Sequence, residues 1–369
     1  MKNSNRHRLA ATLILSLLWI ASSGYGEEAT KTLKGEVYYL EKPDLSLSKR
    51  FEWAQKEFES LRKGEYYLAG YSFESRKEVN IHGHCTKLTD SYRVKLREGE
   101  IVISRKGETG KHFSTDEGTE QVGILFLHKV SKKTPLIIDA DVIDFDNTYE
   151  FKETPLFWLG SVNTDESVSY LEDLIKGGNH DLQQKVVFVC SLHNSPKVYD
   201  FLKGVALGNY SHKARKNAIF WLGSLKDKKS IDYLKDISKR VEITKLRKQV
   251  VFAFQMSDEK EAIEELIRIA KTDMNREVRK NAIFWLGQKA SKECVKALKE
   301  VLEESEDVEL KNNAVFAISQ LPDDRAVPML IDIAKTNKSP SVRKKAIFWL
   351  GQTGDKKALK FFEEILLKK

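Results

Sequence analysis

The sequence is poor in cysteine, and this excludes one way of stabilising a fold. Only three cysteines occur among 369 residues, an odd and sparse set that cannot form a disulfide framework. Hydrophobic residues make up 41% of the chain and charged residues 31%, which is typical of a folded protein. Stability must therefore come from the burial of apolar side chains.

The chain also lacks a concentrated block of basic residues. Lys and Arg number 62 against 54 Asp and Glu, but the excess is spread along the chain, so nucleic acid is not an expected partner. No segment after residue 26 approaches the roughly 20 apolar residues that cross a bilayer as a helix. We therefore expect no membrane span in the mature protein.

Familiar catalytic motifs are missing as well. The sequence contains no G-x-G-x-x-G, no G-x-S-x-G and no phosphate-binding loop. We therefore expect a protein that is not an enzyme and needs no cofactor. The alternative is an envelope enzyme or a metal-binding protein with its site in the amino-terminal domain.

The first 26 residues have the three parts of a secretory signal peptide. Residues 2–8 are basic, residues 9–21 form an apolar run short of membrane-spanning length, and small residues follow. We expect cleavage after Ser23 or Gly26, which would make the protein periplasmic or secreted. Retention of this segment as an anchor is the alternative.

Residues 27–152 predict a small α+β domain whose sheet is mostly antiparallel. Residues 46–63 place Phe51, Ala54 and Phe58 at helical spacing. Strand-like runs punctuated by Gly, Asn and Asp surround this helix. The runs are residues 36–40, 66–73, 92–96, 100–105, 122–130 and 136–145.

Two groups of metal-binding residue types lie in this domain. In a strand, His82 and His84 would lie on one side and Cys85 on the other, a weak candidate pair of ligands for copper or zinc. Four aspartates also lie close together, without the glycine-containing spacing of an EF-hand calcium loop. They are Asp139, Asp141, Asp144 and Asp146. Polar strand and turn positions are the alternative interpretation of both groups.

From Thr154 onward the chain repeats. Phenylalanine recurs at one step of 31 residues and then at steps of 32. The series is Phe157, Phe188, Phe220, Phe252, Phe284, Phe316 and Phe348. Each unit contains two apolar helical patterns separated by a polar turn, and one helix pair cannot bury its apolar face alone. Residues 153–369 therefore predict an α-solenoid of about six helix pairs, with a closing helix at 355–368.

The repeated pattern resembles HEAT repeats, especially the short bacterial type of the phycobilin lyases. Their second helix begins V-R-x-x-A-x-x-x-L-G, and this chain has that pattern twice. The matching residues are Val278, Arg279, Ala282, Leu286 and Gly287, and then Val342, Arg343, Ala346, Leu350 and Gly351. The resemblance implies a binding scaffold. It implies no common active site, and the His-Glu pairs of HEAT-fold hydroxylases are absent.

Helical spacing predicts which positions of each repeat, here called slots, face the core. Residues two before and two after the recurrent Phe are mostly Ala, Val or Leu and face the core, so Phe points away from it. Small residues three after Phe admit a neighbouring helix. Cys190 and Cys294 fall in buried core slots. Trp follows Phe in every second unit, opposite Val or Ala in the others, which indicates packing between adjacent helices.

The slot opposite the core predicts a partner-binding surface on the concave side. Lys stands one turn before Phe in most units, so we expect a groove for a protein or an extended acidic peptide. Its residues are Phe188, Phe220, Phe252, Phe284, Phe316, Phe348, Lys216, Lys248, Lys280 and Lys344. The alternative is a purely structural aromatic ladder. The cations five before each Phe, such as Arg215 and Arg247, are expected to pair with acids of neighbouring units.

In the closing helix, Ala358, Leu359, Phe362 and Leu366 are expected on the buried side.

Overall fold

The chain forms two compact units, Met1–Phe201 (unit 1) and Leu202–Lys369 (unit 2). The computed structural model describes residues 31–41, 44–76, 83–84, 91–97, 100–105, 113–114, 121–130, 136–145 and 148–367. The predicted signal peptide lies outside these residues. Within them, no helix combines the length and the apolar character needed to cross a membrane.

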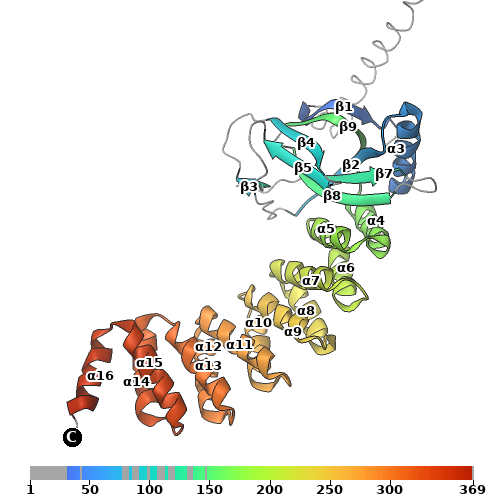
Figure 1. Cartoon of the computed structure of the whole chain (residues 1–369). Helices are drawn as coiled ribbons and strands as arrows, with labels where there is room; N and C mark the ends of the chain where they lie inside the picture. Colours follow the sequence, from blue (N-terminus) through green and yellow to red (C-terminus); the bar gives the residue numbers. More distant parts are fainter. Residues whose placement is uncertain are drawn as a thin grey trace, which may run out of the picture. The chain divides into compact units, whose positions relative to one another are not determined.

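Unit 1 is built on a sheet that has seven strands within the described residues (Figure 1). All six predicted strands are present, and a long final strand adds to them. The strands are β1 (Leu33–Tyr39), β2 (Tyr66–Glu74), β4 (Ser91–Arg97), β5 (Glu100–Arg105), β7 (Gln121–Lys129), β8 (Leu136–Asp144) and β9 (Thr148–Ser161). Their order is β5-β4-β9-β2-β7-β8, with β1 pairing β9. Separately, β3 (Gly83–His84) pairs β6 (Phe113–Ser114).

The sheet is mixed, whereas the sequence predicted a mostly antiparallel one. Strand β9 pairs in parallel with β1, β2 and β4, while β2–β7, β7–β8 and β4–β5 are antiparallel. Helix α3 (Leu47–Leu61) confirms the predicted helix and buries Phe51, Ala54 and Phe58. Phe51 and Phe58 contact Phe126 and Tyr67 of the sheet.

The prediction that Phe157 opens the helical repeats is wrong. Phe157 and Trp158 lie in β9 and are almost wholly buried in the sheet core, where Phe157 stacks on Tyr38 with ring centroids 5.1 Å apart. A short apolar run that is buried on both faces reads the same in a strand as in a helix. The predicted domain boundary near residue 152 falls inside this strand, and the helices begin at Thr164.

Helices fill the rest of both units, as six pairs and a closing helix within the described residues. In unit 1, α4 (Thr164–Gly177) and α5 (His180–Ser191) contact β2 and β8, respectively. The unit boundary falls within α6 (Lys197–Leu207). The remaining helices are α7 (His212–Ser224), α8 (Lys228–Arg240), α9 (Thr244–Gln255), α10 (Lys260–Thr272), α11 (Arg276–Lys289), α12 (Lys292–Glu304), α13 (Val308–Ser319), α14 (Asp323–Thr336), α15 (Pro340–Thr353) and α16 (Lys356–Leu367).

The core slots of the repeat are where the sequence predicted them. Ala218, Ala282 and Ala346 are fully buried, and so are the slots two after Phe, such as Leu222 and Leu286. Cys190 and Cys294 are free and buried, which confirms their assignment to core slots. A Cβ on Gly223 or Gly287 would lie within 2.8 Å of Ala253 or Ala317, respectively. Small residues therefore bring neighbouring second helices into close contact.

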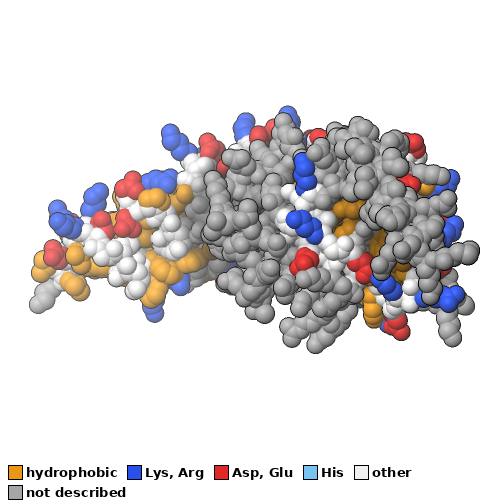
Figure 2. Space-filling model, turned by 90° about the horizontal axis from the view of Figure 1, so that it is seen from above, with side chains coloured by type: hydrophobic (Ala, Val, Ile, Leu, Met, Phe, Trp, Pro, Cys, Tyr) orange, Lys and Arg blue, Asp and Glu red, His pale blue; other side chains and the backbone are white. Residues whose placement is uncertain are grey.

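The closing helix is present, and its predicted buried face is right for Ala358 and partly for the half-buried Phe362, but wrong for Leu359 and Leu366. Ala358 and Phe361 are buried, and Lys335 lies over the Phe361 ring at 5.3 Å. Leu359 and Leu366 are 55% and 81% exposed. Hydrophobic side chains are accordingly visible among charged ones at the carboxy-terminal end of unit 2, at the left of Figure 2. Contact with α14 and α15 selects a face that the apolar pattern of α16 alone leaves ambiguous.

Candidate partner-binding surface

The recurrent Phe and Trp side chains of unit 2 form one continuous row, which we call the aromatic row. It comprises Trp221, Phe220, Phe252, Trp285, Phe284, Phe316, Trp349 and Phe348. These rings are half-buried, except that Phe348 is 51% exposed. Phe188, the other predicted member, is half-buried on α5 in unit 1.

Two kinds of ring contact alternate along the aromatic row. Phe220 stacks on Phe252 at 6.2 Å with an interplanar angle of 9°, and Phe284 stacks on Phe316 at 6.4 Å and 13°. Between these couples, Phe252 meets Trp285 edge-on at 5.2 Å. Such ring pairs contribute about 0.5–1.5 kcal/mol each beyond the area they bury. The row therefore stabilises the array whether or not it also binds a partner.

The 64-residue alternation of Trp with Ala follows from these contacts. Where a unit with Trp precedes a unit with Ala, Gly223 and Ala253 bring the two helix backbones close together, and this allows the Phe rings to stack. At the next step the slot contains Trp285, whose indole reaches the preceding Phe252. The expectation that large and small residues pack between adjacent helices is confirmed.

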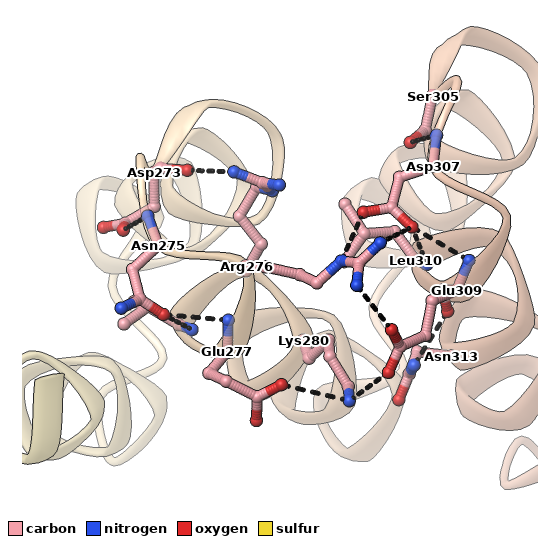
Figure 3. Close-up of polar contacts among 12 residues, drawn as sticks. Asp273, Asn275, Arg276, Glu277, Lys280, Ser305, Asp307, Glu309, Leu310 and Asn313 are labelled. Carbon is pink, nitrogen blue, oxygen red and sulfur yellow. Dashed lines mark hydrogen bonds and ion pairs between the residues drawn. The ribbon is translucent and has the colours of Figure 1, made fainter.

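The predicted lysines differ in their surroundings. Lys248 Nζ lies 3.4 Å from a Glu277 oxygen, and Lys280 Nζ lies 3.2 Å from Glu277 and 2.6 Å from Glu309 (Figure 3). The hydrogen bond from Lys280 lowers the pKa of Glu277, and the one to Glu309 raises the pKa of Lys280. These two ammonium groups are thus neutralised by acids of the second helices.

Lys216 and Lys344 are exposed and make no ion pair within the described part of the chain. Glu277 and Glu309 occupy the same position of the repeat. That position holds Lys245 near Lys216 and Ser341 near Lys344, so these two lysines have no acid there. The predicted basic stripe is therefore interrupted. Positive charge gathers at the two ends of the aromatic row, and Lys345 adds to it by lying 5.3 Å above the Phe348 ring.

The repeated arginines act mainly within their own units, contrary to the expected acidic ladder. Arg279 Nη1 donates to the Asp273 carbonyl at 2.5 Å, and Arg343 Nη1 donates to the Asn337 carbonyl at 2.8 Å. Arg215 does the same for Ala206 at 2.9 Å. A cation there satisfies free carbonyls at the end of the first helix and favours its dipole. Arg247 alone of these also forms an ion pair across units, with Asp273.

The acids form the ladder with other partners. Arg276 donates to both Asp307 oxygens, at 2.7 and 3.0 Å, and approaches Glu309 at 2.9 Å (Figure 3). Asp307 also caps α13 by accepting from the Glu309 and Leu310 backbone. Such two-pronged contacts hold a guanidinium in a defined geometry. This network ties α11 to α13.

Some of the candidate metal-ligand residues of unit 1 lie outside the residues that the structure describes. The side chains of His82, His84 and Cys85 lie outside the described residues, as does Asp146. Asp139 is buried and pairs with Lys185 of α5, while its Oδ1 also accepts from the Ala140 backbone. Asp144 is buried too, so neither aspartate is the solvated strand residue that the sequence suggested. No group of three His, Cys, Asp or Glu that could hold a metal occurs among the described residues.

Unit 1 contains a buried polar network that was not predicted from the sequence. The Ser167 hydroxyl lies 2.7 Å from the Tyr71 hydroxyl and 2.6 Å from His193 Nε2. His193 Nδ1 lies 3.0 Å from the Val189 carbonyl, which can only accept. The proton therefore sits on Nδ1, and Ser167 donates to Nε2 while accepting from Tyr71. The three residues are fully buried and join β2, α4 and the end of α5.

Comparisons with known proteins gave one family match, in the carboxy-terminal part of the helical array. The family model of HEAT repeats matches residues 263–338 and 295–369. Human deoxyhypusine hydroxylase in complex with glycerol is 15% identical, with 55% of this chain and 79% of that chain covered and a TM-score of 0.25. YibA of Escherichia coli is 21% identical, with coverages of 56% and 77% and a TM-score of 0.35.

The complex of CpcE and CpcF of phycocyanin lyase from Nostoc sp. PCC7120 is 15% identical, with 54% of this chain and 80% of that chain covered and a TM-score of 0.31. Curated proteins gave no significant match. The match of the family model agrees with the helix pairs, the buried core slots and the close Gly–Ala contacts described above. Residues 263–369 of this chain match the model of the HEAT-repeat family.

Proposed function

We propose that this chain is an exported, non-enzymatic scaffold that binds a protein or peptide partner along the aromatic row. The observation that carries the proposal is the row itself, in which half-buried aromatic rings lie on the side of each second helix opposite the Ala and Leu core slots. Rings that are already ordered lose little entropy on binding, and they supply apolar contact area.

The charges beside the row support an acidic partner. Lys216, Lys344 and Lys345 lie toward its two ends, whereas Lys248 and Lys280 are already paired with glutamates. A partner would therefore be drawn in by positive charge at the ends and held by apolar contact in the middle. Export through the segment before residue 27 would place this activity in the periplasm or outside the cell.

Replacing the exposed ring at one end tests the aromatic row with little disturbance of the fold. Phe348 is half-exposed and stacks edge-on with Trp349 of its own helix, so Phe348→Ser should lower the melting temperature only slightly. We expect it to reduce partner capture from envelope extract by about tenfold, the loss of about 1.4 kcal/mol of binding free energy. Capture would be followed by crosslinking and titration of the identified partner.

The matched control is Leu366→Ser, which also removes an exposed apolar side chain of unit 2 but lies off the row. It should leave capture unchanged. Equal capture by Phe348→Ser and the wild type, and also by Phe252→Ser with Phe284→Ser, would show that the aromatic row serves the stack alone.

Charge should act mainly on the rate of association. Lys216→Gln with Lys344→Gln removes the two exposed ammonium groups without breaking an ion pair of the described residues. We expect the association rate to fall severalfold at low salt and the difference to vanish as salt screens the charges. Stopped-flow or surface-binding kinetics at several salt concentrations would measure this. A rate that is unchanged at low salt would remove the acidic partner from the proposal.

A further inference from the structure

Within the described residues, ion pairs join α8 to α10 through Lys228 and Glu261, α10 to α12, and α14 to α16, but none joins α12 to α14. Lys271 at the end of α10 reaches Glu300 of α12 at 2.5 Å and Glu304 at 3.6 Å. Two repeats later, Lys335 of α14 reaches Glu364 of α16 at 3.8 Å. Both contacts use the same slots of the 32-residue repeat.

Between α12 and α14 these slots hold two acids. Glu303 stands where Lys271 and Lys335 stand in the neighbouring repeats, and Asp332 stands where Glu300 and Glu364 stand. No ion pair joins α12 to α14 within the described residues, and the two helices lie less closely together than α10 and α12 or α14 and α16. Two carboxylates of like sign cannot replace the missing lysine bridge.

A groove of about 370 Å³ occupies this position, and we call it the α12–α14 groove. Leu302, Met329 and Ile333 supply apolar lining, and Glu303, Asp332 and Lys299 supply charge. Pro328, which lacks a backbone N–H, also lines the groove from within α14. The volume lies at the lower end of the range of ligand sites, and the charged lining residues carry one net negative charge.

We propose that the α12–α14 groove binds an arginine side chain of a partner protein or peptide, in the place of the missing lysine. Between α14 and α16, Lys335 lies over the Phe361 ring and also reaches Glu364, because a long cationic side chain can cover apolar surface while its charged end meets an acid. An arginine entering from outside would lay its methylene stem on Leu302, Met329 and Ile333. Its guanidinium would donate to Glu303 and Asp332, which suits the planar fork of that group. This surface lies on first helices and does not depend on the aromatic row.

A test of this proposal introduces an ion pair between α12 and α14. Glu303→Lys restores the lysine of the neighbouring seams and should pair with Asp332, so it should keep or raise the melting temperature while closing the groove. The probe is the blocked peptide acetyl-Leu-Arg-Leu-Ala-amide, with citrulline in place of arginine as the uncharged isostere. Binding is read from the Met329 methyl resonance in the full chain during titration.

We expect the arginine peptide to bind the wild type at least fivefold more tightly than the citrulline peptide. Glu303→Lys should abolish binding, and Asp332→Asn should weaken it severalfold. Glu306→Lys makes the same charge change outside the groove lining and should leave binding unchanged. The proposal is overturned if the arginine peptide leaves the Met329 resonance unmoved, if citrulline binds equally well, or if folded Glu303→Lys binds like the wild type.

Discussion

Gly287→Ala should destabilise unit 2, whereas Gly351→Ala should leave it unchanged or slightly more stable. Both glycines occupy the same slot, three residues after Phe. A Cβ at Gly287 would lie 2.8 Å from the Ala317 Cβ and carbonyl oxygen, which belong to a neighbouring helix. At Gly351 no atom lies within 4 Å of the added Cβ. The pair of variants therefore separates helix contact from helix propensity.

The expected magnitudes follow from two opposing effects. Alanine stabilises a helix interior by up to about 1 kcal/mol relative to glycine, and this gain applies at both positions. Forcing α11 away from α13 costs about 1–3 kcal/mol, which applies only at Gly287. Because each repeat contacts only its neighbours, a weakened α11–α13 contact should also broaden the unfolding transition of the array.

Urea unfolding followed by circular dichroism, with residue-level hydrogen exchange, would measure both effects. Gly223→Ala is a second test, since its Cβ would lie 2.7 Å from that of Ala253. Equal stability of Gly287→Ala and Gly351→Ala would show that the close Gly–Ala contact carries no energetic weight.

Unit 1 should lose stability as the pH falls below about 6.5. Burial lowers the pKa of His193 and that of His128 from the ordinary value to about 3. His193 accepts from Ser167 as a neutral ring, and His128 stacks on Tyr67 at 4.6 Å. In the folded state both imidazoles therefore stay neutral at pH 5, while in the unfolded chain they take up protons.

The sign of the effect follows from this difference in proton binding. The stabilising contribution is complete above the unfolded-state pKa of about 6.5 and is lost as the pH falls toward 3. Each histidine lowers the free energy of unfolding by up to about 1.4 kcal/mol per pH unit in that window. In unit 2 the sequence has one histidine, His212, which is exposed, so unit 1 should respond more strongly.

Hydrogen exchange at pH 7.0, 6.0 and 5.0 would compare the two units in the same chain, above the range in which most carboxylates titrate. His193→Gln should be less stable at pH 7, because it breaks the contact with Ser167, but it should show a shallower dependence on pH. A pH slope identical to that of the wild type would mean that His193 does not set the acid response.

Residue spacing alone was enough to identify the repeat and its core. Helix pairs of 32 residues, buried slots such as Ala282 and Leu286, and the buried Cys190 and Cys294 could all be read from spacing. Each of these features depends on residues within one helix, and the pattern recurs often enough to stand out. The glycine slot was readable for the same reason, because small residues recur where second helices meet.

Contacts between segments far apart in the sequence could be seen only in the folded structure. The hydroxyl groups of Tyr71 and Ser167 are hydrogen-bonded although 96 residues separate them in the sequence. No residue spacing predicts such a pair. Phe157 matches the repeat motif but lies in β9, because a buried strand has the same composition as a buried helix turn. In α16, packing against its neighbours buried Phe361 and left Leu359 exposed.

The positions of the charged residues could likewise be read from the sequence, but their ion pairs could not. The lysines of the predicted surface are periodic, but only the fold shows that Glu277 and Glu309 neutralise Lys248 and Lys280 while Lys216 and Lys344 face no acid among the described residues. The acids that replace a bridge between α12 and α14 are likewise visible in sequence only after the fold shows which slots face each other. Local periodicity encodes the solenoid, whereas the binding surfaces depend on which slots neighbouring helices bring together.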